Sequence, residues 1–183
     1  MNPASVGVIR HVILDRDGVL NREREQPVRS VEDWQWETGA LRGLARVVAQ
    51  GARLSIVTNQ SAIGRGLVAG ADVDAVHEWL VGELRSMGTD VVGVFACPHA
   101  PDDGCACRKP LPGLVVDAVA ASGVPVEQTV LVGDDRRDLD AAAAAGVRAA
   151  LVLTGKGASV APSVPNGTDV FVDLDAALSV LLA

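Results

Sequence analysis

Hydrophobic residues along the chain form short uninterrupted runs that alternate with longer runs of helical spacing. Uninterrupted runs of this length predict buried strands, and the chain has five: His11–Leu14, Leu54–Val57, Val91–Ala96, Thr129–Val132 and Val147–Leu153. Between them, apolar residues recur every three or four positions, which predicts amphipathic helices. The predicted helices are Leu41–Gln50, Asp72–Met87, a helix between Pro112 and Gly123, Leu139–Ala145 and the tail from Asp173.

This alternation predicts an α/β fold with a mostly parallel sheet that helices cover on both faces. In such sheets, ligands bind beyond the carboxyl ends of the strands. Polar groups follow several of the predicted strands, and we expect them to meet at that edge. They are Asp15 with Asp17, Thr58 with Asn59, Lys109, and Asp134 with Asp135.

The composition narrows the class of protein. A chain of 183 residues suits a single domain spanning 1–183, and 49% hydrophobic residues exclude a disordered chain. A net charge of −7 with only 3% aromatic residues argues against nucleic acid as a partner, because phosphates attract basic patches and bases stack on aromatic rings. No run is apolar enough to span a membrane, and Met1–Arg10 lacks the pattern of a signal peptide. We therefore expect a cytoplasmic protein, and we expect a monomer.

The first predicted strand runs into Leu14-Asp15-Arg16-Asp17-Gly18, which places two carboxylates two residues apart. Side chains at this spacing point the same way on an extended backbone, so Asp15 and Asp17 can face one ligand. One carboxylate can then act as a nucleophile while the other transfers protons. A Mg²⁺ ion would offset their repulsion, with Asp134 as a further oxygen ligand. Taken alone, Asp15–Gly18 is also a common turn sequence.

Two further segments point to phosphate chemistry at the same edge. The hydroxyl of Thr58 and the amide of Asn59 can bind phosphoryl oxygens, although this pair also suits a helix N-cap. Lys109 stands between Arg108 and Pro110, where it can neutralise charge in a phosphoryl-transfer transition state. The convergence of these groups with the two carboxylates favours a functional site over an isolated turn.

Three thiols and one imidazole lie in the loop 97–107: Cys97, His99, Cys105 and Cys107. Four ligands of these types suit a tetrahedral Zn²⁺ and leave no open position, which predicts a structural zinc site. Free thiols or a disulfide are the alternatives, but cytosolic thiols usually stay reduced, and Cys105 and Cys107 are too close in sequence to bridge comfortably. A nucleic-acid-binding zinc knuckle is disfavoured by the negative charge and by the lack of neighbouring aromatic residues.

The motifs DRDGV, TNQS, CRKP and GDDRRD together resemble those of the haloacid dehalogenase-like phosphatases. The longer segments TNQSAIGRG, CPH, CRKPLPG and LTGKG are similar to the subfamily of heptose-bisphosphate and histidinol-phosphate phosphatases, from about His11 to the C-terminus. The resemblance implies a Rossmann-like, doubly wound sheet. Because no insertion of about 60 or more residues separates the motifs, we expect no large cap domain.

The resemblance also implies roles for individual residues. Asp15 is the expected nucleophile, which forms an aspartyl-phosphate, and Asp17 is the expected acid and base. Thr58 and Lys109 are expected to steady the phosphoryl group, and Asp138 to orient Lys109 or a metal-bound water. The expected substrate-binding residues are Asn59, Gln60, Ser61 and Arg108. The expected Mg²⁺ ligands are Asp15, the backbone carbonyl of Asp17 and Asp134.

The implied reaction is hydrolysis of a small phosphorylated metabolite, namely the 7-phosphate of a heptose 1,7-bisphosphate, with histidinol phosphate as the alternative substrate. Two positions depart from the subfamily and bear on the substrate. Asp135 stands where relatives carry a basic residue, and Glu23–Gln26 stands where the heptose enzymes show His-Gly-Tyr. A phospho-acceptor signalling domain is an alternative of another class, but two aspartates after the first strand favour turnover.

Several other residues stand out less. We expect packing or structural roles for Trp34, Trp36, Trp79, His11 and His77. Arg65 suits either a turn or a contact with substrate. Lys156 lies in Thr154-Gly155-Lys156-Gly157, which is not a P-loop because the required glycine spacing is missing.

Overall fold

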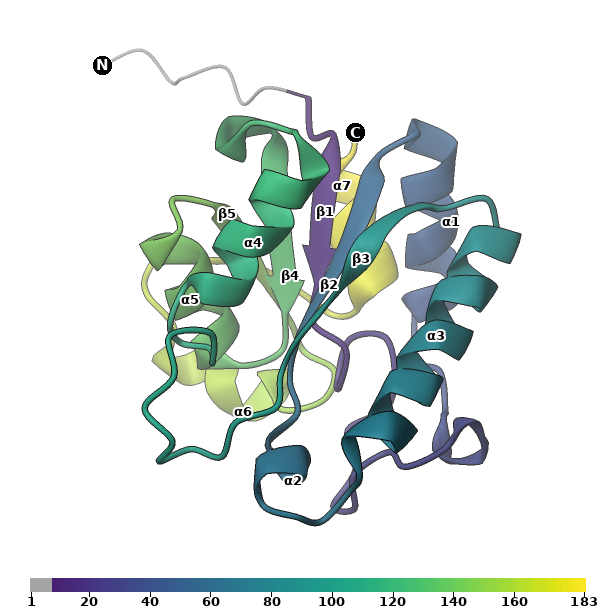
Figure 1. Cartoon of the computed structure of the whole chain (residues 1–183). Coiled ribbons are helices and arrows are strands. Elements are labelled where there is room, and N and C mark those ends of the chain that lie inside the picture. The colour runs from purple at the N-terminus through teal and green to yellow at the C-terminus, as the bar shows by residue number, and fades with distance from the viewer. Residues whose placement is uncertain (1–7) are drawn as a thin grey trace.

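A computed structural model describes residues 8–183 of the chain. Its six strands form one sheet in the order β3-β2-β1-β4-β5-β6, and every pair of neighbours is parallel (Figure 1). The strands are β1 (His11–Leu14), β2 (Arg53–Asn59), β3 (Asp90–Cys97), β4 (Thr129–Gly133), β5 (Arg148–Val152) and β6 (Asp169–Phe171). The predicted α/β fold with a parallel sheet is confirmed.

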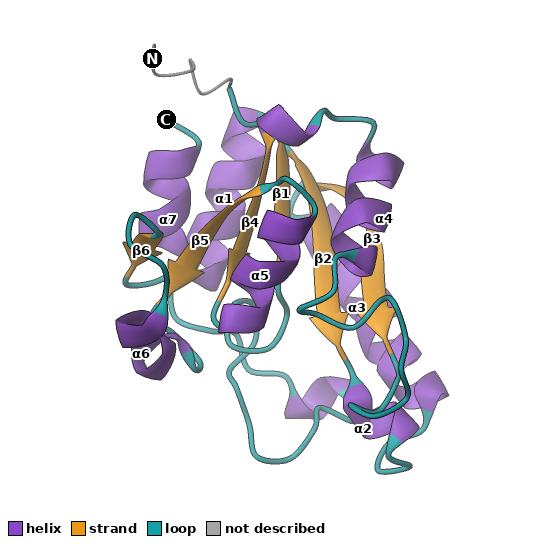
Figure 2. Ribbon diagram, turned by 90° about the vertical axis from the view of Figure 1, so that its left-hand side faces the viewer, coloured by secondary structure: helices purple, strands orange, loops and turns teal. Residues whose placement is uncertain are grey.

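Helices lie on both faces of this sheet, with α4 and α5 on one face and α1, α3 and α7 on the other (Figures 1 and 2). The α-helices are α1 (Ala40–Gln50), α2 (Ser61–Gly64), α3 (Gly70–Ser86), α4 (Gly113–Ser122), α5 (Arg136–Ala144), α6 (Gly157–Val160) and α7 (Leu174–Leu181). Three short 3₁₀ helices are Val31–Asp33, Val126–Gln128 and Ala161–Ser163. The predicted helices are all present, with ends shifted by a few residues.

Alternate side chains of the central strands pack into two separate hydrophobic cores. Val12 and Leu14 belong to the larger core, which also contains Leu44 of α1 and Leu80 of α3. Ile13 points the other way, into the core beneath α4 and α5. Each such side chain contributes about 1.5–3 kcal/mol when it is fully buried, so burial on both faces fixes the register of β1 against its neighbours.

Besides the three 3₁₀ helices, the sequence did not predict β6, α2 and α6. β6 has only three residues at the edge of the sheet, and none of them is fully buried, so its hydrophobic signal is weak. α5 begins at Arg136, three residues before the predicted start at Leu139. The earlier start arises because Asp135 caps this helix, in a capping box with Asp138.

The long connection after β1 closes on itself at its base. Asn21 and Trp36 form an isolated antiparallel bridge, and Trp34 packs edge-on against Trp36 and Trp79 with ring centroids 5.3 and 5.4 Å apart. The packing role expected for these tryptophans is confirmed. The bridge and the rings together hold the segment 22–35 against α3, at the carboxyl-terminal side of the sheet.

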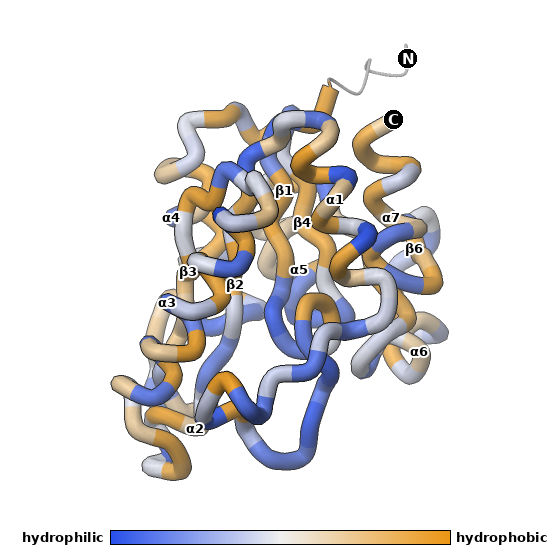
Figure 3. The backbone as a smooth tube through the Cα atoms, turned by 90° about the vertical axis from the view of Figure 1, so that its right-hand side faces the viewer, coloured by the Kyte–Doolittle hydropathy of each residue, from blue (hydrophilic) through white to orange (hydrophobic). Residues whose placement is uncertain are grey.

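The carboxyl ends of the strands meet at one edge, opposite the C-terminus of the chain (Figure 1). Figure 3 shows that hydrophilic residues gather in the loops at this edge, while the strands themselves are hydrophobic. Within residues 8–183, none of the helices combines the length and apolar character that a membrane span requires.

His11 is a buried polar residue at the start of β1, where it bonds to both neighbouring strands. Its Nε2 lies 2.8 Å from Ser55 Oγ, and its Nδ1 lies 3.3 Å from Thr129 Oγ1. Thr129 donates its own hydroxyl proton to Pro125 O, so Nδ1 donates to Thr129 and Nε2 accepts from Ser55. Burial, assisted by the charge of Arg53, lowers the pKa of His11 from 6.5 to about 4.

We predict that His11 makes the fold sensitive to acid. The unfolded chain takes up a proton at His11 below about pH 6.5, whereas the folded chain resists it until about pH 4. The contribution of His11 is therefore present above pH 6.5 and is lost as the pH falls, up to about 3 kcal/mol. His11→Gln should flatten the dependence of the unfolding free energy on pH in this window, measured by urea denaturation. Parallel curves for wild type and variant would contradict the assignment.

Candidate active site

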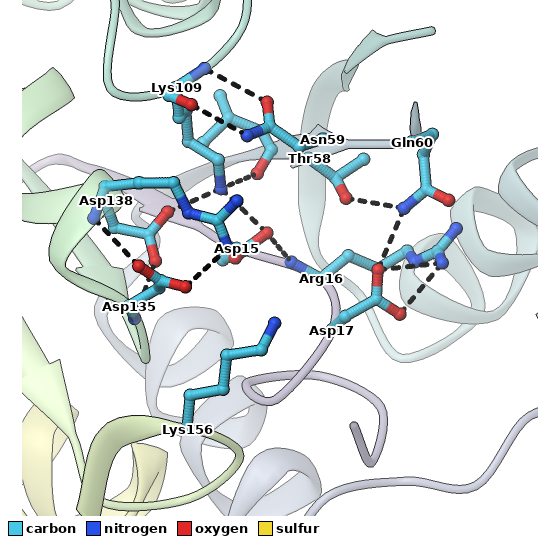
Figure 4. A network of polar contacts seen from close by, with 12 residues as sticks. Asp15, Arg16, Asp17, Thr58, Asn59, Gln60, Lys109, Asp135, Asp138 and Lys156 are labelled. Carbon is cyan, nitrogen blue, oxygen red and sulfur yellow. Dashed lines mark hydrogen bonds and ion pairs between the residues drawn. The ribbon is translucent and has the colours of Figure 1, made fainter. Parts of the chain in front are cut away.

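Lys109 connects two acidic side chains at the carboxyl edge of the sheet. Its Nζ lies 2.9 Å from Asp15 Oδ1 and 2.5 Å from Asp138 Oδ1, and it donates to Val57 O at 3.0 Å (Figure 4). The Asn59 side chain fixes the Lys109 backbone, accepting from its N–H at 3.1 Å and donating to its C=O at 3.0 Å. Burial opposes the charge of Lys109, but Asp138 and Asp15 outweigh it and raise the pKa of the lysine.

Three carboxylates form a compact group around this lysine. Asp15, Asp134 and Asp138 each place an oxygen within 4.8 Å of the others. Burial, reinforced by the neighbouring negative charges, raises the pKa of Asp15 to about 7 and that of Asp134 to about 8. When fully ionised, the three carboxylates carry more negative charge than the single ammonium of Lys109 balances. Oxygen donors with excess negative charge are the ligands that Mg²⁺ prefers, so these residues fit that ion.

Backbone groups from two glycine-containing loops enclose Asp134. Gly18 and Gly155 have positive φ values of 83° and 53°, and a Cβ on either one would overlap the Asp134 carboxylate. Thr154 Oγ1 donates to Gly18 O at 2.6 Å, and the Lys156 N–H donates to Asp134 Oδ2 at 2.8 Å. Only glycine permits this close approach, so the sequence LTGKG positions a carboxylate of the acidic group.

The Asp17 carboxylate has a different set of partners. Arg16 Nη2 donates to both of its oxygens at 2.9 Å, and Asn21 Nδ2 and Gln60 Nε2 each donate to one oxygen at 2.9 Å. Burial alone would raise the pKa of Asp17, but the Arg16 guanidinium and these hydrogen bonds hold it below its usual range. Asp17 is therefore ionised, and Figure 4 shows its carboxylate turned away from Lys109 and towards Arg16.

Two of these partners are themselves fixed from other elements. Arg16 is 1% exposed, and its Nη1 lies 3.0 Å from Nε2 of His77 on α3. Burial, together with the Arg16 charge, lowers the pKa of His77 to about 4, which keeps the ring neutral and able to accept. Gln60 Nε2 also donates to Thr58 Oγ1 at 2.8 Å, which links the end of β2 to the Asp17 network.

Most of the charged and polar side chains described above line one cavity of about 560 Å³ at the sheet edge. Every residue expected from the sequence to bind Mg²⁺ or substrate contributes to its wall: Asp15, Asp17, Thr58, Asn59, Gln60, Ser61, Arg108, Lys109 and Asp134. The structure adds residues that the sequence did not single out for this site: Arg16, Arg24, Arg137 and Lys156. Three of these lie within the quoted motifs, Arg16 in DRDGV, Arg137 in GDDRRD and Lys156 in LTGKG, so the motifs were the sequence signal that could have identified them.

Asp135 lies at this cavity with its charge already balanced. Its Oδ1 accepts from the Arg137 N–H at 3.1 Å, and its Oδ2 lies 2.5 Å from Arg137 Nη2. It caps α5, while the Asp138 side chain accepts from the N–H of Asp135 at 3.0 Å. The carboxylate at this departure from the subfamily pattern therefore starts the helix that carries Asp138.

The four residues of the cysteine loop form a second cluster, away from the carboxylates. Cys97 Sγ lies 3.7 Å from Cys105 Sγ and 3.5 Å from His99 Nδ1, and His99 Nδ1 lies 3.2 Å from Cys107 Sγ. A tetrahedral Zn²⁺ with ordinary bond lengths separates two sulfurs by about 3.8 Å and a sulfur from a nitrogen by about 3.6 Å. Sulfur and nitrogen donors at this spacing fit Zn²⁺, with His99 binding through Nδ1.

Comparison with known proteins assigns the class. The family model described as HAD-hydrolase-like matches residues 106–177. The D-glycero-beta-D-manno-heptose-1,7-bisphosphate 7-phosphatase of Bordetella bronchiseptica is 42% identical over 93% of this chain and 97% of its own length. The D-glycero-alpha-D-manno-heptose-1,7-bisphosphate 7-phosphatase of Photorhabdus laumondii is 34% identical over 80% of this chain and 84% of its own length.

A solved structure agrees with these relatives. The D,D-heptose 1,7-bisphosphate phosphatase of Bordetella bronchiseptica, crystallised with magnesium and phosphate, superposes with a TM-score of 0.86 at 41% identity, covering 95% of this chain and 98% of that one. Fold and site thus define a phosphatase of the haloacid dehalogenase-like class. Within that class, the chain belongs to the family of heptose-1,7-bisphosphate 7-phosphatases.

We predict that Gly155→Ala disrupts the site by displacing Asp134. A positive φ costs an alanine about 1–2 kcal/mol wherever it occurs, so Gly123→Ala, at φ 65° with no atom near its Cβ, is the matched control. Gly123→Ala should lose only this amount of stability in thermal unfolding, whereas Gly155→Ala should lose more, because its Cβ also overlaps Asp134 and the Gly18 backbone. Only Gly155→Ala should also lose phosphatase activity, by about 100-fold, because it misplaces a carboxylate of the site. Equal activity in the two variants would contradict this role of Gly155.

Proposed function

We propose that this protein is a Mg²⁺-dependent phosphatase that removes the 7-phosphate of D-glycero-D-manno-heptose 1,7-bisphosphate. The relatives named above carry this activity in their names, which favours a heptose bisphosphate over histidinol phosphate. The greater identity to a beta-type relative favours the beta anomer. The observation that carries the proposal is the arrangement of charge in the cavity, where cations lie both beside the acidic group and away from it.

Seven cationic side chains line the cavity, and five of them hold a carboxylate. The pairs are Arg16 with Asp17, Arg24 with Asp33, Lys109 with Asp15 and Asp138, Arg137 with Asp135, and Lys156 with Glu23. Arg65 and Arg108 form no ion pair with any residue in 8–183; Arg108 only reaches His99 O, at 3.5 Å. Two arginines without a carboxylate partner support a substrate with a second anionic group.

In the first step, an Asp15 carboxylate oxygen attacks phosphorus, and the bond between phosphorus and the sugar oxygen breaks. Asp17, which is ionised in the free protein, takes up a proton when the phosphate dianion binds beside it, because a neighbouring negative charge disfavours the carboxylate, and it gives this proton to the leaving oxygen. Lys109, fixed between Asp15 and Asp138, balances charge on the transferring group, and the Thr58 hydroxyl donates to one of its oxygens. The products are the dephosphorylated sugar and an aspartyl-phosphate at Asp15.

In the second step, Asp17 removes a proton from a water molecule that attacks the phosphorus of the aspartyl-phosphate. The bond between phosphorus and Asp15 breaks, which releases inorganic phosphate and restores both aspartates. The ionised form of Asp17 is the one that this step needs. The contacts from Arg16, Asn21 and Gln60 support that form.

Two metal ions belong to this proposal. Asp15, Asp134 and the Asp17 carbonyl would hold Mg²⁺, with Asp138 beside them, and the ion would supply positive charge that offsets repulsion between carboxylates and phosphate. Cys97, His99, Cys105 and Cys107 would hold a structural Zn²⁺, which keeps the loop before Arg108 and Lys109 in place. The single domain, the monomeric state and the cytoplasmic location stay predictions.

The function is tested by phosphate release in the presence of Mg²⁺ from both anomers of the heptose 1,7-bisphosphate, the heptose 7-phosphate and histidinol phosphate. We expect the highest kcat/KM with the beta bisphosphate. Arg65→Met should lower kcat/KM for the bisphosphate by roughly tenfold but leave the monophosphate unaffected, because it removes a contact to the second anionic group. Asp15→Asn should release no phosphate. Equal kcat/KM for the bisphosphate and histidinol phosphate would contradict the proposed substrate.

Removal of one cysteine tests the zinc site. Cys105→Ser should lower the zinc content measured by elemental analysis from one ion per chain towards none, because three ligands bind far more weakly than four. It should also lower kcat, since the loop that positions Lys109 loses its anchor. Ala106→Ser changes the same loop without touching a ligand and should keep both the zinc and the activity. Wild-type protein that contains no zinc would overturn the assignment.

A further inference from the structure

The loop that encloses Asp134 also carries Lys156, whose side chain lines the cavity. The backbone of Lys156 is fixed by its hydrogen bond to Asp134, and its Nζ lies 2.7 Å from Glu23 Oε1 on the segment that follows β1. The two side chains are 44% and 32% exposed, and both line the cavity. Figure 4 shows the Lys156 side chain extending towards the group around Asp15. The ion pair therefore joins two segments of the cavity wall that are far apart in the sequence.

Glu23 differs from the other acidic residues of the cavity wall. Seven acidic and seven basic residues line the cavity, so its formal charge is balanced. Asp15, Asp134 and Asp138 form the acidic group, while Asp17 and Asp135 are held by arginines on their own segments. Within residues 8–183, the one ion pair of Glu23 is with Lys156.

We propose that Glu23 sets the affinity of the site for phosphate by competing with it for Lys156. A phosphate dianion in the cavity meets the Lys156 ammonium only when it displaces the Glu23 carboxylate, and it approaches Glu23 against charge repulsion. Lys156 is thus a specificity-determining cation for phosphate esters. Glu23 weakens the binding of phosphate to Lys156, so that the product leaves. The proposal rests on the proposed function and names a role for two residues of that site.

A different result is expected if the ion pair between Glu23 and Lys156 has only a structural role. If the pair only held the segment 22–28 in place, the loss of either partner would loosen the same contact and change phosphate affinity in the same direction. Competition predicts opposite directions, because Glu23→Gln frees the cation whereas Lys156→Met leaves an unpaired carboxylate facing the ligand. The sign of the two effects therefore separates the two roles.

The experiment measures the dissociation constant of inorganic phosphate by isothermal titration calorimetry on the Mg²⁺-loaded, zinc-containing protein, together with KM for the bisphosphate. Glu23→Gln should lower the dissociation constant roughly fivefold, and Lys156→Met should raise it by a similar factor, as expected for one partly exposed ion pair. The double variant should bind phosphate more tightly than Lys156→Met and more weakly than Glu23→Gln, because it lacks both the cation and the unpaired carboxylate. Thermal unfolding verifies that all variants fold.

Glu25→Gln is the matched control, since Glu25 lines the same cavity from the same segment and forms none of the ion pairs within residues 8–183. It removes the same charge and should change the dissociation constant by less than half as much as Glu23→Gln. A shift in the same direction for Glu23→Gln and Lys156→Met overturns the inference, as does an equal effect of Glu25→Gln.

The two proposals fail separately. Opposite shifts in phosphate affinity, with no hydrolysis of the heptose bisphosphate, would support the role of Glu23 and overturn the proposed substrate. Hydrolysis of the bisphosphate, with shifts in one direction, would overturn the role of Glu23 alone. Wild-type protein that binds no phosphate in the presence of Mg²⁺ would overturn the role of Glu23, while the hydrolysis assay would still decide the proposed substrate.

Discussion

The ammonium of Lys109, held between Asp15 and Asp138, is the interaction on which the site depends. Three carboxylates are buried at the sheet edge, and an unpaired charge in such surroundings costs several kcal/mol. Lys109 reaches them from the loop after β3, Asn59 fixes its backbone from β2, and Asp138 comes from α5. One cation thus ties together segments that are far apart in sequence. The rigid sheet sets the spacing of these segments, and the positive charge of the lysine offsets the repulsion between the carboxylates at that spacing.

The cavity has three regions that differ in their electrostatic character. Around Lys109, negative charge exceeds positive charge, which suits a divalent cation. At Asp17, an arginine and two amides stabilise the ionised carboxylate, which suits a base. On the remaining wall, Arg65 and Arg108 have no carboxylate partner within residues 8–183, while Lys156 pairs with Glu23. The local arrangement, and not the net charge of −7, is what allows an acidic protein to receive an anion.

Much of this arrangement could be predicted because of the sheet. Asp15, Thr58 and Asp134 follow parallel strands, and the carboxyl ends of such strands meet at one edge whatever the rest of the chain does. The bond from Arg16 to His77 could not be predicted, because it depends on how α3 packs against the sheet. The pairing of Lys156 with Glu23 could not be predicted from the sequence either, since it depends on the path of the segment 22–35. Short elements such as β6 carry too few buried residues to produce a pattern.

The tryptophan cluster has a practical consequence. The chain contains three tryptophans and no tyrosine, and all three rings lie within one contact group at the base of the segment that carries Glu23. Intrinsic fluorescence excited near 295 nm, the usual wavelength for tryptophan, therefore reports from a single place in the molecule. That place adjoins Asn21, which bonds directly to Asp17. The protein thus carries a built-in optical probe next to its active site, with no background from other parts of the fold.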